Sequence, residues 1–210
     1  MTDAMRVEKN IFLVDDDADV SCALTMFLVS AGYSVKSFPS AEAFLEEAGS
    51  AVGGVMLLDQ RMTGMSGIEL QSELPRRGIF LPIIFITGHG DVQTSVKALK
   101  AGAIDFLEKP FSHKDLLASL KEAFLQFNNQ KQDHDLVAEI GRCYVSLTRR
   151  EKEVMQHVVA GVSNRQLAER LQLSPRTIEV YRSRVMKKMG AEALPNLVRI
   201  YDICEQAGLK

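Results

Sequence analysis

The run NIFLVD at residues 10–15 decides the fold, because it is a short, nearly continuous apolar segment that ends in a carboxylate. Four more segments of the first half have strand-like composition, at residues 33–38, 55–59, 82–87 and 104–108. Near-continuous apolar strands separated by helices are typical of a parallel sheet that is covered on both faces. The sequence therefore predicts an α/β doubly wound sheet of five parallel strands.

Stretches with helical periodicity separate these strands. We expect the first helix to end near residue 31, and the others to cover residues 40–48, 67–77, 91–101 and 112–130. The polar run QFNNQKQDHD at residues 126–135 lacks a strong apolar period. We interpret it as the fraying end of the last helix and a linker.

Residues 144–210 have helical periodicity only and predict an all-α domain. Thr148 and Ser163 are each followed three residues later by Glu or Gln, so each predicts a capping box at the start of a helix. Ser174, which precedes a proline, predicts the start of a third helix. Pro195 begins a fourth.

The charge of the chain is divided unevenly, although its formal net charge is only −2. Residues 1–141 carry 12 Lys and Arg against 20 Asp and Glu, a net charge of −8, whereas residues 142–210 carry 13 against 7, a net charge of +6. An acidic half joined to a basic half indicates two domains with different partners. We expect domains at residues 1–128 and 144–210, with a linker at residues 129–143.

Composition excludes several classes of protein. Apolar residues are 46% and charged residues 25% of the chain, which is ordinary for a globular protein and not for a disordered one. The longest uncharged run, residues 20–35, is shorter than the ~20 mostly apolar residues of a membrane span and is broken by Ser21, Ser30 and Gly32. The N-terminus lacks the apolar segment of a secretory signal. Three scattered cysteines without CxxC spacing argue against a disulfide framework and a zinc site. We expect a cytoplasmic protein with no membrane partner.

Acidic residues gather at one predicted edge of the sheet. Asp15, Asp16 and Asp17 stand at the end of the first strand, and Asp59 ends the third. Carboxylates that converge in this way repel one another unless a cation lies between them. Oxygen ligands suit a hard ion, so the sequence predicts a Mg²⁺ site. A single Asp after a strand more often caps the following helix, and Asp17 fits that role.

Two further polar residues reach the same edge, because Thr87 ends the fourth strand and Lys109 follows the fifth. A carboxylate beside a metal, a hydroxyl and an ammonium is suited to phosphoryl chemistry. Asp59 is the expected nucleophile, which would attack phosphorus and hold an acyl phosphate. Mg²⁺ and Lys109 would stabilise charge on the transferring oxygens, and Thr87 would hydrogen-bond to the bound phosphoryl group.

Four motifs make residues 9–128 resemble the receiver domain of a two-component response regulator, which has a flavodoxin-like fold: VDDD at 14–17, LLDQRM at 57–62, ITG at 86–88 and EKPF at 108–111. The resemblance implies that Asp59 is the phosphoacceptor and that Asp15 and Asp16 complete the metal site with it. It also implies that Phe106 is an aromatic switch, which turns inward on activation.

Three further residues belong to the loops around this predicted site. Arg61 and His89 flank it and are candidates for setting the lifetime of the phosphoryl group. Thr63 departs from the receiver pattern, which usually has Pro after the Met of this loop. That departure puts the rigidity of the loop in question, not the chemistry.

The third helix of the second half combines an apolar stripe with a basic outer surface. The stripe repeats at helical spacing and consists of Ile178, Tyr181, Val185 and Met189. The rest of the helix carries five cations against one acid, Glu179. With the preceding short helix and the turn QLS at residues 172–174, it predicts a helix-turn-helix that enters the major groove of DNA.

The sequences LTRREKEVM at 147–155 and AGVSNRQLAERLQLSPRTIEVYRSRVMKKMG at 160–190 closely resemble a LuxR-type helix-turn-helix. With the receiver in front, the whole chain resembles the NarL/FixJ family and is most similar to its FixJ-like members. The resemblance makes the third helix the recognition helix. It implies that Val180 and Ser183 approach the bases. The implied phosphate contacts are Arg176, Arg182, Lys187 and Lys188. Asn164 and Thr177 would contact the DNA backbone near the starts of helices.

The last predicted helix has one apolar stripe, formed by Leu197, Tyr201 and Cys204. Two interpretations remain open for it. The stripe either covers the core of its own domain or takes part in pairing two DNA-binding domains.

These observations predict a phosphorylation-dependent DNA-binding transcriptional regulator. A sensor histidine kinase would donate the phosphoryl group, the phosphorylated chain would form a homodimer on double-stranded DNA, and RNA polymerase is a further candidate partner. Apart from self-phosphorylation and slow hydrolysis of its own aspartyl phosphate, no enzymatic activity is expected. The alternatives are a regulator that binds DNA without phosphorylation, a phosphoryl-sink interaction module, and an enzyme acting on phosphorylated small molecules.

Overall fold

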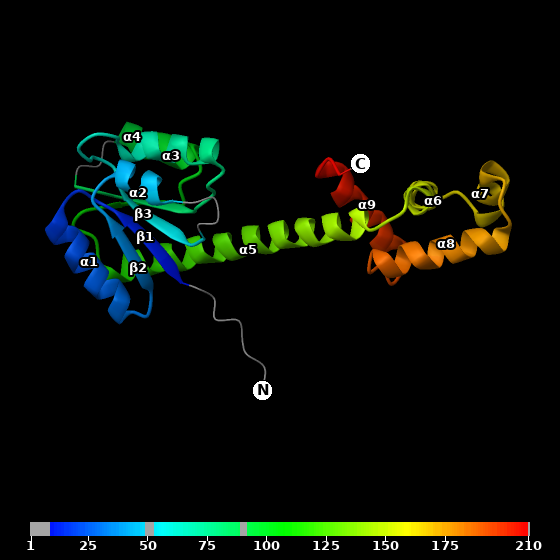
Figure 1. The fold of residues 1–210 in the computed structure, drawn as a ribbon. Helices are drawn as coiled ribbons and strands as arrows, with labels where there is room; N and C mark the ends of the chain where they lie inside the picture. The colour runs from blue at the N-terminus through cyan, green and yellow to red at the C-terminus, as the bar shows by residue number, and fades with distance from the viewer. Residues whose placement is uncertain (1–8, 49–52, 89–91, 210) are drawn as a thin grey trace. The chain divides into compact units, whose positions relative to one another are not determined.

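The computed structural model describes residues 9–48, 53–88 and 92–209 (Figure 1). The chain divides into two compact units, Met1–Gln130 and Lys131–Lys210, and each is described by itself. His89, which the sequence places beside the predicted phosphoryl site, lies outside the described residues.

The first unit is built on five parallel strands in the order β2-β1-β3-β4-β5. The strands are β1 (Asn10–Val14), β2 (Ser34–Phe38), β3 (Val55–Asp59), β4 (Ile83–Thr87) and β5 (Asp105–Glu108). Every residue of β3 and β4 is buried, because these two strands lie in the interior of the sheet and are covered on both faces. The structure confirms the predicted doubly wound parallel sheet.

Helices cover both faces of this sheet (Figure 1). They are α1 (Ala18–Ser30), α2 (Ala41–Glu47), α3 (Gly67–Glu73), α4 (Val92–Lys100) and α5 (His113–Val145), with a short 3₁₀ turn, η1 (Pro75–Arg77), after α3. Neighbouring residues of β3 belong to different cores. Leu57 packs with Leu28 of α1 and Leu116 of α5, whereas Leu58 packs with Phe44 of α2 and Leu70 of α3.

The predicted helix at residues 67–77 is interrupted. It ends as an α-helix at Glu73, and Pro75 opens the 3₁₀ turn, which Gly78 closes in a left-handed conformation with φ 72°. Proline has no N–H to continue the helical hydrogen bonds, so a change of helix type at this point has a local cause.

Helix α5 is longer than the sequence predicts. It continues for 33 residues to Val145, so the expectation that the helix frays over residues 126–135 is wrong. The residues predicted as linker, 129–143, are helical throughout. Two features favour this outcome: the segment contains no proline, and Ile140 and Tyr144 near its end are buried in the core of the second unit. A polar composition alone does not end a helix whose far end is anchored by packing.

The second unit is all-helical. The C-terminal part of α5 is followed by α6 (Arg149–Val159), α7 (Asn164–Leu171), α8 (Pro175–Lys188) and α9 (Leu194–Gln206). Capping boxes open α6 and α7 at Thr148 and Ser163, and the Ser174 hydroxyl caps α8, as predicted. Leu197 and Cys204 of α9 are buried in the core of this unit, so their stripe covers its own domain.

Within the described part of the chain, no helix is both long enough and apolar enough to cross a membrane.

Candidate phosphoacceptor site and DNA interface

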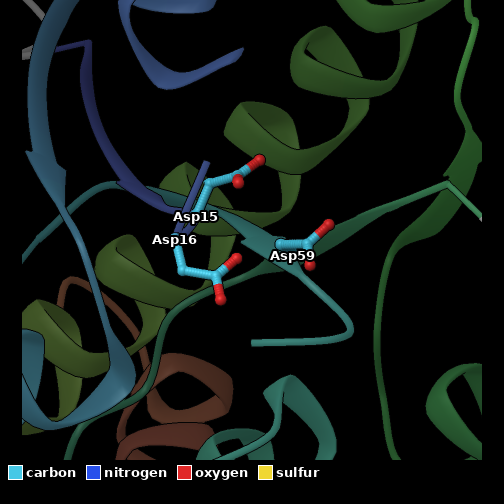
Figure 2. A group of neighbouring side chains, drawn as sticks. All are labelled: Asp15, Asp16 and Asp59. Carbon is cyan, nitrogen blue, oxygen red and sulfur yellow. The ribbon is translucent and has the colours of Figure 1, made fainter. Parts of the chain in front are cut away.

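Three carboxylates meet at the C-terminal edge of the sheet. Asp15 and Asp16 follow β1, and Asp59 is the last residue of β3, which pairs directly with β1. One oxygen from each carboxylate lies within 4.8 Å of the others (Figure 2). Asp15 and Asp59 are buried, whereas Asp16 is exposed. The structure thus brings together the three residues that the sequence predicts for a metal site.

Lys109 links the two buried carboxylates. Its Nζ lies 2.9 Å from Asp15 Oδ2 and 3.2 Å from Asp59 Oδ1. Burial alone would lower the pKa of Lys109, but the hydrogen bond and charge of Asp15, together with Asp59, raise it above its usual value. The ammonium is therefore charged at neutral pH and offsets part of the negative charge.

Burial is the main reason that the pKa of Asp59 is raised above its ordinary value, and the charge of Asp15 adds to this effect. The nearby Lys109 ammonium acts in the opposite direction without cancelling it. A further positive charge nearby would stabilise the ionised form of this buried carboxylate, which is otherwise costly to ionise.

The donor set fits a magnesium ion. It offers carboxylate oxygens only, and one ammonium leaves a cluster of three carboxylates short of neutrality. Hard divalent cations prefer such oxygens, and Mg²⁺ is commonly bound by one or two carboxylates while it keeps several waters. Asp15, Asp16 and Asp59 would hold it.

Thr87 lies on β4, which pairs with the strand that carries Asp59, and Phe106 lies on the next strand, β5. Thr87 is buried, and its carbonyl accepts a hydrogen bond from the Lys109 backbone N–H at 2.6 Å. Phe106 is half-buried, and its ring centroid lies 6.0 Å from that of Phe85 in the sheet interior. The two residues that the sequence assigns to response and switching therefore occupy neighbouring strands.

Asp17 has the capping role. Its side chain accepts hydrogen bonds from the backbone N–H groups of Asp19 and Val20 at the start of α1. Its own N–H donates to Asp15 Oδ1 at 2.9 Å, which helps to fix the buried carboxylate.

Sequence reasoning missed one contact of the site. Thr63, noted only as a departure from the receiver pattern, donates both its backbone N–H and its hydroxyl to Asp16 Oδ2, at 2.8 Å and 3.1 Å. No local signal could have revealed this contact, because the two residues are 47 positions apart and meet through a loop. Arg61, predicted to flank the site, donates its backbone N–H to Asp59 Oδ2 at 2.9 Å.

Helix α8 has the two faces that its sequence predicts. Ile178, Val185 and Met189 are buried in the core of the second unit, and Tyr181 is half-buried. The residues exposed on its other faces include Arg176, Val180, Ser183 and Lys187. Thr177 is half-buried, and its hydroxyl lies 2.8 Å from that of Ser174 at the start of the helix.

Two of the predicted phosphate contacts have partners inside the protein. Arg182 Nη1 donates to Asn164 Oδ1 at 2.9 Å, which joins α8 to the first residue of α7. Lys188 Nζ lies 2.7 Å from Glu151 Oε2 and donates to the Ser146 carbonyl at 3.1 Å. Lys188 is thus tied to the start of α6, while Arg176 and Lys187 remain on the exposed surface.

Comparisons with known families agree with both halves of this description. Residues 11–121 match the response regulator receiver domain. Residues 145–201 match the bacterial regulatory proteins of the luxR family. The first match contains the carboxylate cluster, and the second contains the basic helix.

Individual proteins match over most of the chain. The response regulator protein TmoT of Ectopseudomonas mendocina is 43% identical over 92% of this chain and 88% of its own length. The transcriptional regulatory protein FixJ of Rhizobium meliloti (strain 1021) is 43% identical over 90% of this chain and 93% of its own.

Among solved structures, the response regulator StyR is similar with a TM-score of 0.84 and 38% identity, over 93% of this chain and 98% of that one. Full-length FixJ from B. japonicum is similar with a TM-score of 0.58 and 40% identity, over 97% of this chain and 98% of that one. The chain therefore belongs to the two-component response regulators of the NarL/FixJ family, as a FixJ-like member with a receiver domain and a LuxR-type DNA-binding domain.

Proposed function

We propose that this regulator is switched by transfer of a phosphoryl group from a sensor histidine kinase to Asp59. The observation that carries the proposal is the cluster of Asp15, Asp16 and Asp59 with Lys109 between the two buried carboxylates. A receiver domain implies a kinase partner, and a LuxR-type domain implies a DNA partner.

In the transfer step, an oxygen of Asp59 attacks phosphorus while the bond from phosphorus to the kinase histidine nitrogen breaks. The electron pair of that bond stays on the imidazole, and Asp59 becomes an acyl phosphate. Bound Mg²⁺ would supply charge neutralisation on the transferring oxygens. Lys109 would stabilise the same charge from the protein side, and Thr87, at the end of the strand that pairs with β3, would hydrogen-bond to the new phosphoryl group.

Turnover by this chain is limited to its own phosphorylation and to slow hydrolysis of the aspartyl phosphate. Water attack on the acyl phosphate would return Asp59 and release inorganic phosphate. Arg61, whose backbone N–H already contacts Asp59, stands where its side chain could influence the lifetime.

The response to phosphorylation passes through Thr87 and Phe106. A phosphoryl group on Asp59 would draw the Thr87 hydroxyl toward it and leave room for Phe106 to turn inward against Phe85. The altered receiver surface would then support a homodimer that binds two DNA half-sites, since linking two modules makes the second binding event effectively intramolecular. Contact with RNA polymerase would follow at the bound promoter.

For the DNA complex, we propose that Arg176 and Lys187 reach phosphates, while Val180 and Ser183 approach base edges. Arg182 and Asn164, which hydrogen-bond to each other, contact the DNA backbone as a pair, and Thr177 contacts it near the start of α8. The receiver is assigned to residues 1–128 and the DNA-binding domain to residues 144–210, with the helical residues 129–143 between them.

The decisive experiment combines phosphorylation with DNA binding by the full-length chain. Wild-type protein treated with acetyl phosphate and Mg²⁺ should shift on a phosphate-affinity gel, form dimers and protect operator sites in genome-wide footprinting. The Asp59→Asn variant should do none of these.

Each alternative has its own outcome in this experiment. An equal gel shift of the Asp59→Asn variant would refute the phosphoacceptor assignment. Equal DNA protection with and without phosphorylation would favour a phosphorylation-independent regulator, and phosphorylation without any DNA protection would favour a phosphoryl sink.

A further inference from the structure

Thr63 makes two hydrogen bonds to one oxygen of the exposed carboxylate in the site. Its backbone N–H lies 2.8 Å, and its hydroxyl 3.1 Å, from Asp16 Oδ2. Both donors come from the loop that follows β3, whereas Asp16 follows β1. The contact therefore ties together the two chain segments that supply the carboxylates.

The loop that carries Thr63 is held on both sides. Before it, the Arg61 backbone N–H donates to Asp59 Oδ2 at 2.9 Å. After it, the Met65 backbone N–H donates to Glu42 Oε1 of α2 at 2.8 Å. Because two neighbouring amides are fixed by separate carboxylates, the position of the Thr63 amide follows from the loop as a whole and does not depend on one side-chain rotamer.

Asp16 needs such a restraint more than its neighbours do. Asp15 and Asp59 are buried and share the Lys109 ammonium. Asp16 is exposed, and the hydrogen bonds of the Lys109 ammonium go to the other two carboxylates. Repulsion from two nearby carboxylates favours rotation of an exposed side chain out into water, and the two donors of Thr63 oppose that rotation.

We propose that Thr63 is a positioning residue that preorganises Asp16 for Mg²⁺ and so raises the affinity of the site for the ion. The inference rests on the metal role proposed above for the three carboxylates. Hydrogen bonds to one carboxylate oxygen orient the group and leave the other oxygen for a cation, and partners of this kind commonly change metal affinity by about 10–100-fold. Proline, which the receiver pattern usually has here, provides neither the N–H nor the hydroxyl.

The test is a Mg²⁺ titration of the full-length chain. Calorimetry and the amide NMR signals around the site measure the binding. Thr63→Ser keeps both donors and should bind Mg²⁺ as wild type does. Thr63→Val keeps only the N–H and should bind about threefold more weakly, and Thr63→Pro keeps neither and should bind about tenfold more weakly. Ser72→Ala, on the exposed surface of α3, is the matched control and should change nothing.

A second arm separates this role from a general effect on folding. In an Asp16→Ala background, Thr63→Val should no longer weaken Mg²⁺ binding, because its effect passes through the Asp16 carboxylate. An equal weakening in that background would overturn the proposal, as would wild-type affinity in both the Val and the Pro variants.

The remaining outcomes are also decisive. If Thr63→Pro fails to fold, as its NMR spectrum would reveal, the comparison of Val with Ser decides alone, and equal affinities would refute the role. If wild-type protein itself does not bind Mg²⁺, the metal role under "Proposed function" fails, which is distinct from a failure of Thr63 alone.

Discussion

Lys188 forms an ion pair with the buried carboxylate of Glu151, whose Oε2 lies 2.7 Å from the Lys188 Nζ. Glu151 is also the N3 residue of the capping box that begins α6, so this contact joins the end of α8 to the start of α6. The hydrogen bond from Lys188 is the main reason that the pKa of Glu151 is lowered. A lysine that the sequence places on the DNA face thus stabilises the domain itself.

The first prediction contrasts Lys188 with its neighbour. Lys188→Met should lower the free energy of unfolding of the DNA-binding unit by about 1–3 kcal/mol, because the Glu151 carboxylate remains buried without its cation. Lys187→Ala should leave stability nearly unchanged and reduce the salt dependence of DNA binding by about one unit. Urea unfolding monitored at α8 amides, together with gel shifts at several salt concentrations, measures both. The reverse pattern would favour the predicted role of Lys188 as a phosphate contact.

A second prediction concerns the pair formed by Arg182 and Asn164. The bond between them holds the Arg182 guanidinium at the start of α7. Asn164→Ala and Arg182→Ala should each weaken operator binding. The double variant should lose less binding free energy than the sum of the losses of the two single variants. We expect a coupling energy of about 0.5–1.5 kcal/mol in a double-mutant cycle of DNA affinity. Full additivity would mean that the two residues contact DNA independently.

The third prediction follows from the cation between the buried carboxylates. Lys109→Gln removes the ammonium, so repulsion between Asp15 and Asp59 should lower the melting temperature in the absence of metal. Saturating Mg²⁺ should then raise the melting temperature more than it does for wild type, because an ion that binds the folded state replaces the lost charge. Melting curves with EDTA and with Mg²⁺ provide the comparison. The same rise in both proteins would mean that Lys109 does not offset the charge that Mg²⁺ meets.

The fourth prediction uses the raised pKa of Asp59. In the unfolded chain this carboxyl ionises at its ordinary value, and in the folded chain it ionises at a higher pH. As pH rises, ionisation of this carboxyl therefore stabilises the unfolded state first. The contribution of Asp59 to stability is present below the ordinary pKa and is lost as pH rises through the pKa of the folded state. Unfolding of metal-free wild type and Asp59→Asn at several pH values should show that wild type loses stability relative to the variant across this window. Parallel pH profiles would contradict the raised pKa.

The strand ends were the most predictable part of the site. Apolar runs that stop at Asp15, Asp59 and Thr87 indicate parallel strands, and parallel strands bring their carboxyl ends to one edge. This topology alone, without any side-chain detail, predicts that Asp15 and Asp59 meet. The structure confirms their proximity and places Lys109, which the sequence also predicts at this edge, between them.

The parts that escaped prediction depend on long-range partners. Helical periodicity predicts which face of α8 is buried, but it does not reveal that Lys188 meets Glu151 or that Arg182 meets Asn164. The contact of Thr63 with Asp16 depends on a loop conformation, which a periodic pattern does not encode. The length of α5 was not predicted for the same reason. Its C-terminal residues Ile140 and Tyr144 are buried by partners in the core of the second unit, which the local sequence pattern does not reveal.

The contact between Lys109 and Asp15 spans 94 positions of the chain, and this span has a consequence for synthesis on the ribosome. A nascent chain that has emerged only as far as Asp59 contains the proposed phosphoacceptor but not the cation that contacts it, nor β4 and β5. Domains fold as units in the order of their synthesis. The receiver therefore completes this site only after Lys109 has left the exit tunnel, however early Asp15 and Asp59 emerge.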